Sequence, residues 1–394
     1  MLALGLLLSS LSGCGSDRQG NAPAPAKPPG QAGSYALEPV WEQKLLAHQF
    51  EAYAVFTREG FIYVGSGGPE GQVSKVDMAT GKTAWSHKTG QSYQPSFPVS
   101  NGRMVIYGEY YNAFIVGLSD ETGKELWKVP TKSQNMSAAT FADDLAFIGS
   151  YDKHLHAIDW AKGTVRWKTE LGAEIWSRPC AWQGLILVGC YDGFLYSLER
   201  TTGNIAWKLN CGGRICWDLV LAGDLVFVGV DGQWHDEKYD PSKIGQTIMV
   251  IDLNTKQVLA RFATGPGGWS RRIIVEGNDV YFFSPARLCS FDLKARKLSW
   301  QFDPGQSVLG YPLVCEKAIL LPMNAEGREG QHRENLIVLS RSTGEVLQKQ
   351  ESGGIGMNWP EYVQYRDMVI STHARKAYKV TAKAPAPAPE SNRH

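Results

Sequence analysis

Aromatic side chains accompanied by charged ones recur at similar intervals along the sequence. The residues concerned are Trp176 and Arg178, Trp217 and Asp218, Trp269 and Arg271, Tyr311, and Trp359 and Glu361. Rings supply apolar contact area and charges fix orientation, so such a set, if gathered around one opening, could bind a flat ligand or a peptide. The alternative is that the rings simply fill the interior of the fold. The elements that position these residues decide between the two.

Histidines and cysteines are the other groups with chemical potential. His154 and His156 share one face of a strand, as metal ligands do, but no third ligand lies near them in the sequence. A surface or inter-blade role is the more common alternative. Cys211 and Cys216 flank a short loop and are the best candidates for a disulfide, although the sequence leaves open whether it forms. Most of the remaining cysteines are expected to be buried thiols: Cys180, Cys190, Cys289 and Cys315.

The N-terminal segment MLALGLLLSSLSG is an apolar run that is too short to cross a bilayer and is followed by Cys14. Leu11-Ser12-Gly13-Cys14 resembles the bacterial lipobox, and this resemblance implies a lipoprotein signal peptide over residues 1–13 and lipidation of Cys14. The alternative is an ordinary cysteine. Gly15, rather than Asp, after Cys14 implies delivery to the outer membrane, facing the periplasm. No Lys or Arg precedes the apolar run, so the true start codon stays open.

Two segments have compositions that cannot form a packed core. Residues 14–36 are rich in Pro, Ala and Gly and are expected to form an extended tether, and residues 383–394 a disordered tail. No other apolar stretch is long enough for a transmembrane helix.

Between these ends, one segment recurs along the chain. A clear copy, from Val76 to Trp85 (VDMATGKTAW), combines an acidic residue, a Thr-Gly pair and a closing Trp. Strands of this kind end at Trp41, Trp85, Trp127, Trp167, Trp207, Ala260, Trp300 and Gln348. A period of about 40 residues is typical of proteins built from one repeated supersecondary unit.

Each unit holds four short apolar segments separated by turn residues. Around Cys180 these segments cover residues 175–182, 185–190, 194–199 and 204–209. We therefore predict an all-β fold, a single eight-bladed β-propeller of four-stranded antiparallel blades over residues 37–382. The N-terminal strand with Trp41 would complete the last blade and close the ring, which removes free sheet edges.

The charges of the chain nearly cancel. There are 40 basic and 39 acidic side chains, and the formal net charge is +1. This balance argues against a nucleic-acid-binding protein that works by bulk charge.

The Asp…Thr-Gly…Trp arrangement of the repeat resembles the PQQ-like (quinoprotein-type) propeller repeat. The signatures of WD40 and kelch blades are absent at the corresponding positions. We expect the repeat tryptophans to wedge between adjacent blades, and the aromatic and charged pairs to surround the mouth of the central channel.

The same repeat occurs in quinone-dependent dehydrogenases, and a PQQ-dependent or other ligand-binding or catalytic propeller is the alternative interpretation. Those enzymes hold the quinone against a Trp, cap it with a disulfide between adjacent cysteines, bind calcium and position an Asp as base. This sequence has no adjacent cysteine pair, and Asp218 and Glu361 are its only obvious channel acids. We expect no enzyme, no cofactor and no metal; PQQ and calcium enter only under the alternative.

Two insertions interrupt the period, at residues 232–246 in the fifth blade and 324–335 in the seventh. Both fall between the second and third strands, so they would project from the same face of the propeller. They are either tolerated surface loops or a partner-docking rim. Trp234 and Tyr239 give the first insertion the aromatic and ionic mixture of an interface.

A lipobox, a short tether and an eight-bladed PQQ-like propeller together resemble the BamB family of the outer-membrane β-barrel assembly machinery. This resemblance implies a non-catalytic, membrane-tethered scaffold, monomeric within a larger complex. Its partners would be envelope proteins, namely a β-barrel assembly subunit and unfolded outer-membrane clients, with no nucleic acid. No motif of this sequence matches a known contact residue of that subunit, so the partner and the propeller face that it uses stay open.

Overall fold

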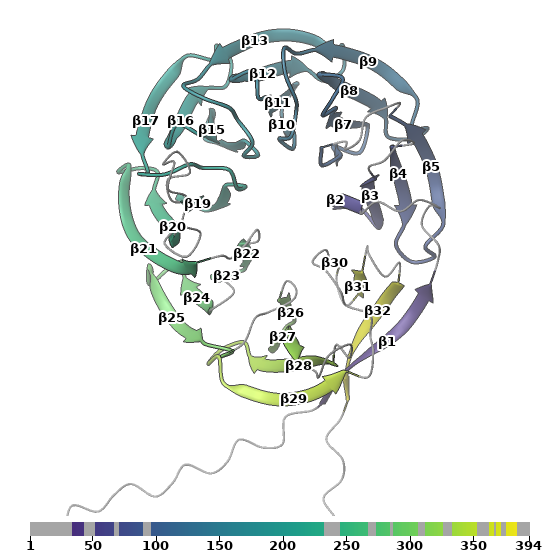
Figure 1. Ribbon diagram of the computed structural model, residues 1–394, viewed down its shortest axis with the longest axis vertical. Coiled ribbons are helices and arrows are strands. Elements are labelled where there is room, and N and C mark those ends of the chain that lie inside the picture. Colours follow the sequence, from purple (N-terminus) through teal and green to yellow (C-terminus); the bar gives the residue numbers. More distant parts are fainter. Residues whose placement is uncertain are drawn as a thin grey trace, which may run out of the picture.

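The computed structural model describes residues 34–42, 52–66, 71–89, 96–231, 245–266, 273–283, 287–305, 312–325, 333–352, 362–365, 368–371 and 376–383. These residues form eight four-stranded antiparallel sheets arranged around a central axis (Figure 1). The described residues contain strands, turns and loops but no helix. The predicted all-β, eight-bladed propeller is confirmed.

The first four blades use strands that follow one another in sequence. Blade 1 consists of β2 (Ala52–Arg58), β3 (Phe61–Ser66), β4 (Gln72–Asp77) and β5 (Thr83–Lys88). Blade 2 consists of β6 (Val99–Ser100), β7 (Met104–Gly108), β8 (Phe114–Ser119) and β9 (Glu125–Pro130). Blade 3 consists of β10 (Thr140–Ala142), β11 (Leu145–Gly149), β12 (His154–Asp159) and β13 (Thr164–Glu170). Blade 4 consists of β14 (Cys180–Trp182), β15 (Leu185–Gly189), β16 (Phe194–Glu199) and β17 (Ile205–Asn210).

The next three blades follow the same order. Blade 5 consists of β18 (Val220–Ala222), β19 (Leu225–Val230), β20 (Gly245–Asp252) and β21 (Gln257–Pro266). Blade 6 consists of β22 (Ile273–Glu276), β23 (Asp279–Phe283), β24 (Leu288–Asp292) and β25 (Lys297–Phe302). Blade 7 consists of β26 (Leu313–Val314), β27 (Ala318–Ala325), β28 (Arg333–Ser340) and β29 (Val346–Ser352).

Blade 8 joins the two ends of the chain. It contains β30 (Tyr362–Tyr365), β31 (Met368–Ser371) and β32 (Lys376–Lys383), and its outermost strand is β1 (Ser34–Glu42). β1 pairs antiparallel with β32, from Ser34 opposite Lys383 to Glu42 opposite Lys376. The N-terminal strand therefore completes the last blade, as predicted, although it begins at Ser34 rather than at residue 37.

The inner strand of blade 4 is shorter than the sequence predicts. A strand was expected over 175–182, but β14 covers only Cys180–Trp182. Ser177 explains the difference, because its hydroxyl donates to the carbonyl of Gly189 and accepts from the N–H of Gly189, both at 2.9 Å. The Ser177 side chain thus bonds the backbone groups of Gly189 that a longer inner strand would have paired with. The residues before Cys180 therefore form a loop at the end of the blade.

The core lies between neighbouring blades, where the faces of two sheets meet. Phe147, Leu155 and Val188 are fully buried between blades 3 and 4. Leu187, Val226 and Met249 play the same part between blades 4 and 5. Blades 2 to 6 are therefore each stabilised by apolar burial against both neighbours, which is the usual way that repeats too small to fold alone become stable.

The turns between third and fourth strands use glycine as the repeat predicts. Gly81, Gly123, Gly163, Gly203 and Gly344 have φ between 69° and 76°. Four of these glycines meet a tryptophan of the preceding blade, so a Cβ at Gly123 would lie 2.5 Å from Trp85. The glycine is needed for the turn and also for this close approach.

The repeat tryptophans also donate hydrogen bonds across the boundary between blades. The indole N–H of Trp85 donates to the carbonyl of Asp120 at 2.8 Å, and that of Trp167 to Arg200 at 3.0 Å. Trp127 and Trp300 donate in the same way to Trp160 and Arg341. The prediction that these rings wedge between blades is confirmed for the described side chains.

No helix in the described part of the chain has the length and apolar character needed to cross a membrane. The insertions lie mostly outside the described residues, but the strands on either side are second and third strands, β19 with β20 and β27 with β28, as expected.

Candidate functional site

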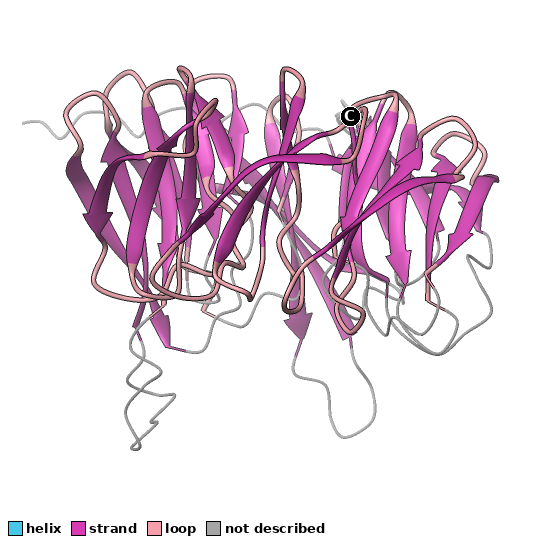
Figure 2. Ribbon diagram, turned by 90° about the horizontal axis from the view of Figure 1, so that it is seen from above, coloured by secondary structure: helices cyan, strands magenta, loops and turns pink. Residues whose placement is uncertain are grey.

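Loops that enter the first strand and loops that join the second to the third strand lie on one face of the propeller, because the strands alternate in direction. The Thr-Gly turns lie on the opposite face, and Figure 2 shows the strands running between these two faces. We call the first of them the mouth face. In blades 2 to 5 the structure describes these loops apart from residues 90–95 and 232–244.

The mouth face of blades 2 to 5 carries an aromatic surface. Its members are Tyr110, Tyr111, Tyr151, Trp176, Tyr191 and Trp217. Trp176 is central, because its ring lies 6.3 Å from the rings of Tyr151, Tyr191 and Trp217. The rings of Tyr151 and Tyr191 are 5.9 Å apart, and their hydroxyls are 3.2 Å apart. These tilted arrangements have the separations that aromatic pairs favour.

Exposure differs across this surface. Trp176, Trp217, Tyr151 and Tyr191 are half-buried, so each keeps part of its ring in contact with solvent. Tyr111 is 60% exposed and packs edge-on against Tyr110 with centroids 4.6 Å apart. Partly exposed rings held by their neighbours present apolar contact area that loses little side-chain entropy on binding.

A buried carboxylate supports one edge of the aromatic surface. Asp231 is 6% exposed and accepts a hydrogen bond from the thiol of Cys216 at 2.8 Å and from the indole N–H of Trp217 at 3.1 Å. The N–H of Asp231 donates to the carbonyl of Arg214 at 2.8 Å. Burial, together with the nearby charge of Asp231, raises the pKa of the Cys216 thiol. Cys216 is therefore a hydrogen-bond donor and not a nucleophile.

Arg178 and Asp218, two of the charged residues predicted at the channel mouth, link neighbouring blades. The backbone N–H of Arg178 donates to Oδ1 of Asp218 at 3.2 Å, from blade 4 to blade 5. Nε of Arg178 donates to the hydroxyl of Thr140 at 3.2 Å, from blade 4 to blade 3. These charged groups therefore have a structural role around the channel.

Of the predicted mouth residues, the structure brings Trp176, Arg178, Trp217 and Asp218 together on one face. The other candidates lie outside the described residues: Trp234, Tyr239, Trp269, Arg271, Tyr311, Trp359 and Glu361. Cys14 also lies outside them, and the side chain of Trp41 is not described.

Sequence reasoning missed Tyr151, Tyr191, Arg214 and Asp231. A recognisable pattern was present, because Tyr-Asp occurs at Tyr151-Asp152 and again at Tyr191-Asp192, each pair two residues after the glycine that ends a second strand. Among the loops between second and third strands, the sequence analysis singled out only the two long insertions, so the short loops with Tyr151 and Tyr191 were left out. The aromatic surface combines those loops with the loops between second and third strands.

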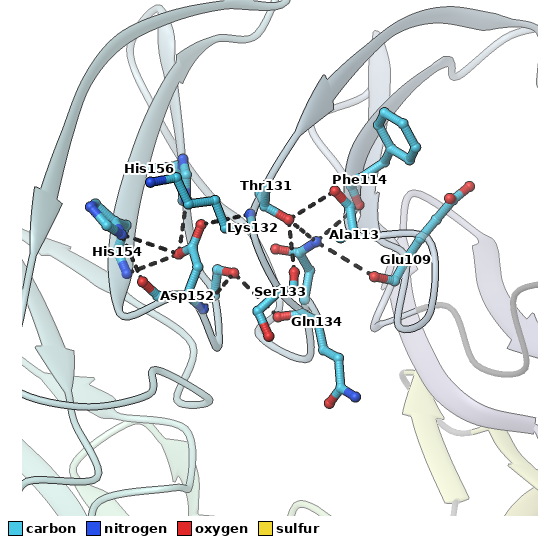
Figure 3. Close-up of polar contacts among 12 residues, drawn as sticks. Glu109, Ala113, Phe114, Thr131, Lys132, Ser133, Gln134, Asp152, His154 and His156 are labelled. Carbon is cyan, nitrogen blue, oxygen red and sulfur yellow. Dashed lines mark hydrogen bonds and ion pairs between the residues drawn. The ribbon is translucent and has the colours of Figure 1, made fainter.

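The two histidines form a polar cluster with Asp152 rather than a metal site. Nδ1 of His154 is 2.8 Å from the carbonyl oxygen of Asp152, and Nε2 of His156 is 3.4 Å from Oδ1 of Asp152 (Figure 3). Asp152 also accepts the N–H groups of Lys132 and His154. Burial opposes ionisation of Asp152, but these hydrogen bonds outweigh it and lower its pKa. Within the described ranges, no group of three or more His, Cys, Asp or Glu side chains could hold a metal ion.

The candidate disulfide between Cys211 and Cys216 is wrong. Both thiols are free and buried, as are those of Cys190 and Cys289, while Cys180 and Cys315 are free and half-buried. Cys216 faces Asp231, whereas the thiol of Cys211 lies 3.7 Å from the carbonyl of Leu209. Burial raises the pKa of Cys211 to about 11 and that of Cys190 to about 12. The sequence separation was suitable, but the loop turns the two side chains towards different partners.

The described residues do not fit a quinone of the PQQ type. The described cysteines are all free and none is adjacent to another, so they offer no disulfide to cap a quinone held against Trp176 or Trp217. The carboxylates of Asp218 and Asp231 accept hydrogen bonds from Arg178, Cys216 and Trp217. We therefore derive no reaction step through such a group.

Three comparisons with known proteins bear on this architecture. A family model described as "Outer membrane protein assembly factor BamB" matches residues 69–175 and 161–237. The crystal structure of BamB from Moraxella catarrhalis is similar with a TM-score of 0.63 at 13% identity, over 90% of this chain and 99% of that one.

The computationally designed protein Ika8 is similar with a TM-score of 0.64 at 16% identity, over 87% of this chain and 99% of that one. A search of curated protein sequences gave no match. Because a designed protein matches as well as BamB does, the structural likeness concerns the fold alone. The chain is a β-propeller with a BamB-like fold, and its residues 69–237 match the BamB family model.

Proposed function

We propose that this protein is a non-catalytic, membrane-tethered interaction scaffold of the bacterial cell envelope that takes part in the assembly of outer-membrane β-barrel proteins. Its partners would be a β-barrel assembly subunit and unfolded outer-membrane clients. A lipid chain on Cys14 would hold the propeller at the periplasmic side of the outer membrane, with residues 14–33 as tether.

One observation carries this proposal. The two matches to the BamB family model together span residues 69–237, and this range contains the whole aromatic surface of blades 2 to 5. The repeats that are most similar to an assembly factor are therefore the repeats that present partly exposed rings.

The chemistry of the surface supports a protein partner. Tyr, Trp and Arg are the residues most enriched at the energetic centres of protein–protein interfaces. Here Trp176 is surrounded by three other rings, and Arg214 lies over Tyr191 at 4.5 Å. The charged groups nearby, Arg178 and Asp218, already have partners within the fold and add rigidity to the loops. A rigid aromatic surface binds without a large ordering cost.

Site-specific photo-crosslinking tests the proposal. A photoreactive amino acid at Tyr111, on the mouth face, is expected to capture a β-barrel assembly subunit in intact cells. The same amino acid at Thr201, which is exposed in the turn before β17 on the opposite face, is the matched control. Capture from Thr201 but not from Tyr111 would contradict the assignment of this face.

The tether and the catalytic alternative have tests of their own. Replacing Cys14 by Ser should move the protein from the membrane fraction to the soluble fraction, and unchanged partitioning would contradict lipid anchoring. Purified protein given PQQ and calcium should not reduce a dye with an alcohol or a sugar as donor. Sustained turnover in that assay would replace the scaffold by the catalytic alternative.

A further inference from the structure

We propose that the aromatic surface of blades 3 to 5 binds a cationic side chain, arginine or lysine, presented by a partner polypeptide. The inference rests on the proposed function in one respect only, namely that the partner is a protein. The structure assigns the central position to Trp176, which contacts Tyr151, Tyr191 and Trp217.

The fold already places one cation on these rings. The guanidinium carbon of Arg214 lies 4.5 Å from the centroid of Tyr191, well within the separation at which a cation is attracted to the face of a ring. Tyr191 is in turn in contact with Tyr151 and Trp176. A guanidinium is therefore compatible with the local packing, and Trp176 and Tyr151 are the half-buried rings next to the one that Arg214 occupies.

Hydrogen bonding makes the ring of Trp217 a better partner for a cation. Trp217 donates its indole N–H to the buried carboxylate of Asp231 at 3.1 Å. A carboxylate that accepts from an indole N–H increases the electron density of the ring, and the attraction between a cation and a ring is electrostatic. Asp231 is 6% exposed, so solvent screens its charge only weakly.

The loops around these rings carry an excess of acidic groups. Residues 131–139, 150–153, 171–179, 190–193 and 211–219, with Asp231, contain five acidic side chains, Asp152, Glu174, Asp192, Asp218 and Asp231. They contain four basic side chains, Lys132, Lys153, Arg178 and Arg214. Arg178 is bonded to Thr140 and Arg214 is stacked on Tyr191, so both are engaged within the fold. Four of the carboxylates, those of Asp152, Asp192, Asp218 and Asp231, also accept hydrogen bonds within the fold, but from uncharged N–H, O–H and S–H donors among others, so the loops keep a small net negative charge. Partly exposed rings with a net negative border favour a cation over an anion.

Titration calorimetry of the full chain with three peptides of equal length tests this inference. In each peptide glycine alternates with one other residue, which is Arg, Lys or Glu, and both ends are blocked. We expect the Arg peptide to bind most tightly and the Glu peptide to bind at least tenfold more weakly, since a desolvated cation–ring contact is worth roughly a factor of ten or more. Equal binding of the Arg and Glu peptides would overturn the inference.

A pair of tryptophan variants locates the binding. Trp176→Leu should weaken binding of the Arg peptide about tenfold by removing the central ring. Trp160→Leu, which alters a half-buried ring in the turn before β13 on the opposite face, should leave binding unchanged. Trp176→Phe, which retains a ring, should restore most of the affinity and confirms that Trp176→Leu does not act by unfolding. Equal losses for Trp176→Leu and Trp160→Leu would overturn the inference.

A charge variant separates the acidic contribution. Asp218→Asn keeps an oxygen to accept the N–H of Arg178 but removes the charge. It should weaken binding of the Arg peptide a few-fold and reduce the dependence on salt concentration, because an exposed charge contributes a long-range, screened attraction. If affinity and salt dependence are unchanged, the claim that acidic side chains contribute to binding of the cation is overturned.

The inference and the proposed function fail independently. If the Arg peptide binds with the predicted preference but Tyr111 captures no assembly subunit in cells, only the proposed function is overturned. If Tyr111 captures that subunit and the peptides show no preference for Arg or Lys, only the inference is overturned.

Discussion

The boundaries after blades 1 to 6, where the structure describes the side chains, are of two kinds that differ at one turn position of the following blade. At the boundaries after blades 1, 2, 3 and 6, a tryptophan packs on a glycine of the next blade and donates its N–H to a carbonyl there. At the boundaries after blades 4 and 5, Lys256 and Arg296 occupy the glycine position, with φ of 60° and 53°.

At the boundaries of the second kind, a long side chain rather than a close backbone approach fills the space beside the tryptophan position. Nζ of Lys256 lies 6.0 Å from the centroid of Trp207, so a side chain covers the ring where glycine would have let it approach the backbone. After blade 5 the tryptophan itself is missing, since Ala260 stands in its place, and Arg296 forms an ion pair with Asp252 across the boundary. At the boundary after blade 5 a small residue stands in place of Trp and a large one in place of Gly, which indicates compensation there, whereas the boundary after blade 4 keeps Trp207 beside Lys256.

The largest effect is expected from removing a tryptophan of the first kind. Trp85 is 8% exposed, and Trp85→Ala should lower the free energy of unfolding by about 4 kcal/mol through the cavity and the lost hydrogen bond to Asp120. Leu126→Ala is the control, because Leu126 is 53% exposed and should change stability by no more than about 0.5 kcal/mol. Urea denaturation measures both. Similar values for the two variants would show that the boundary tryptophan does not stabilise the ring.

A smaller loss is expected from adding one methyl group at the glycine. A Cβ at Gly203 would lie 2.6 Å from the ring of Trp167, and its φ is 76°, so Gly203→Ala should cost about 3 kcal/mol. Lys256→Ala at the equivalent position of the next blade should cost less than about 1 kcal/mol, because that backbone already carries a Cβ. Equal losses at the two positions in thermal or urea unfolding would remove the distinction between the two kinds of boundary.

The boundary between blades 1 and 2 contains an additional acid-sensitive contact. Burial raises the pKa of Asp120, but hydrogen bonds from Lys75, Ser100 and Tyr63 outweigh it and hold the pKa below its usual value. Since the folded pKa is depressed, the stabilisation is present above the unfolded pKa of about 4 and is lost as the pH falls through the folded value.

Asp120→Asn isolates this contact. The variant should be less stable by about 2 kcal/mol at neutral pH, and the difference from the parent protein should shrink as the pH is lowered below about 4. Unfolding by urea between pH 7 and pH 3 measures the difference. If the difference in the free energy of unfolding stays constant over that range, the effect comes from packing and not from the charge of Asp120.

The smallest effect concerns the compensating pair after blade 5. Ala260→Trp should destabilise the protein because Arg296 occupies the space, and Arg296→Gly should destabilise it because the pair with Asp252 is lost. The double variant restores the arrangement of the other boundaries, so the two changes together should cost about 1 kcal/mol less than their sum. A double-mutant cycle measures this coupling, and strict additivity would show that the two positions do not compensate.

The repeat made most of the fold predictable from the sequence, whereas only part of the aromatic surface at the mouth face could be predicted. Each copy of the repeat has the same order of four strands, so the number of blades could be counted from the sequence. The last blade lacked a fourth strand, and the N-terminal strand with Trp41 was the one left to complete it. The contacts of Trp176 did not follow, because Tyr191 lies in its own blade but Tyr151 and Trp217 lie in the blades on either side. The same limit explains the error at Cys211 and Cys216, where spacing suggested a bond and the loop separated the two thiols.

The sequence by itself determined the local chemistry of this protein: the strand periods, the positive-φ glycine turns and the tryptophan that follows most of them. These are properties of one repeat, and each is set by residues close together in the chain. Only the tertiary structure decided which loops meet at the mouth face. Trp176 contacts Tyr151 and Trp217 because closure of the ring sets the distance and angle between blades. Cys216 faces Asp231 because two loops of blade 5, distant in the sequence, meet at this face. The arrangement of the loops at the mouth face depends on the packing of neighbouring blades and cannot be read from the sequence of one repeat.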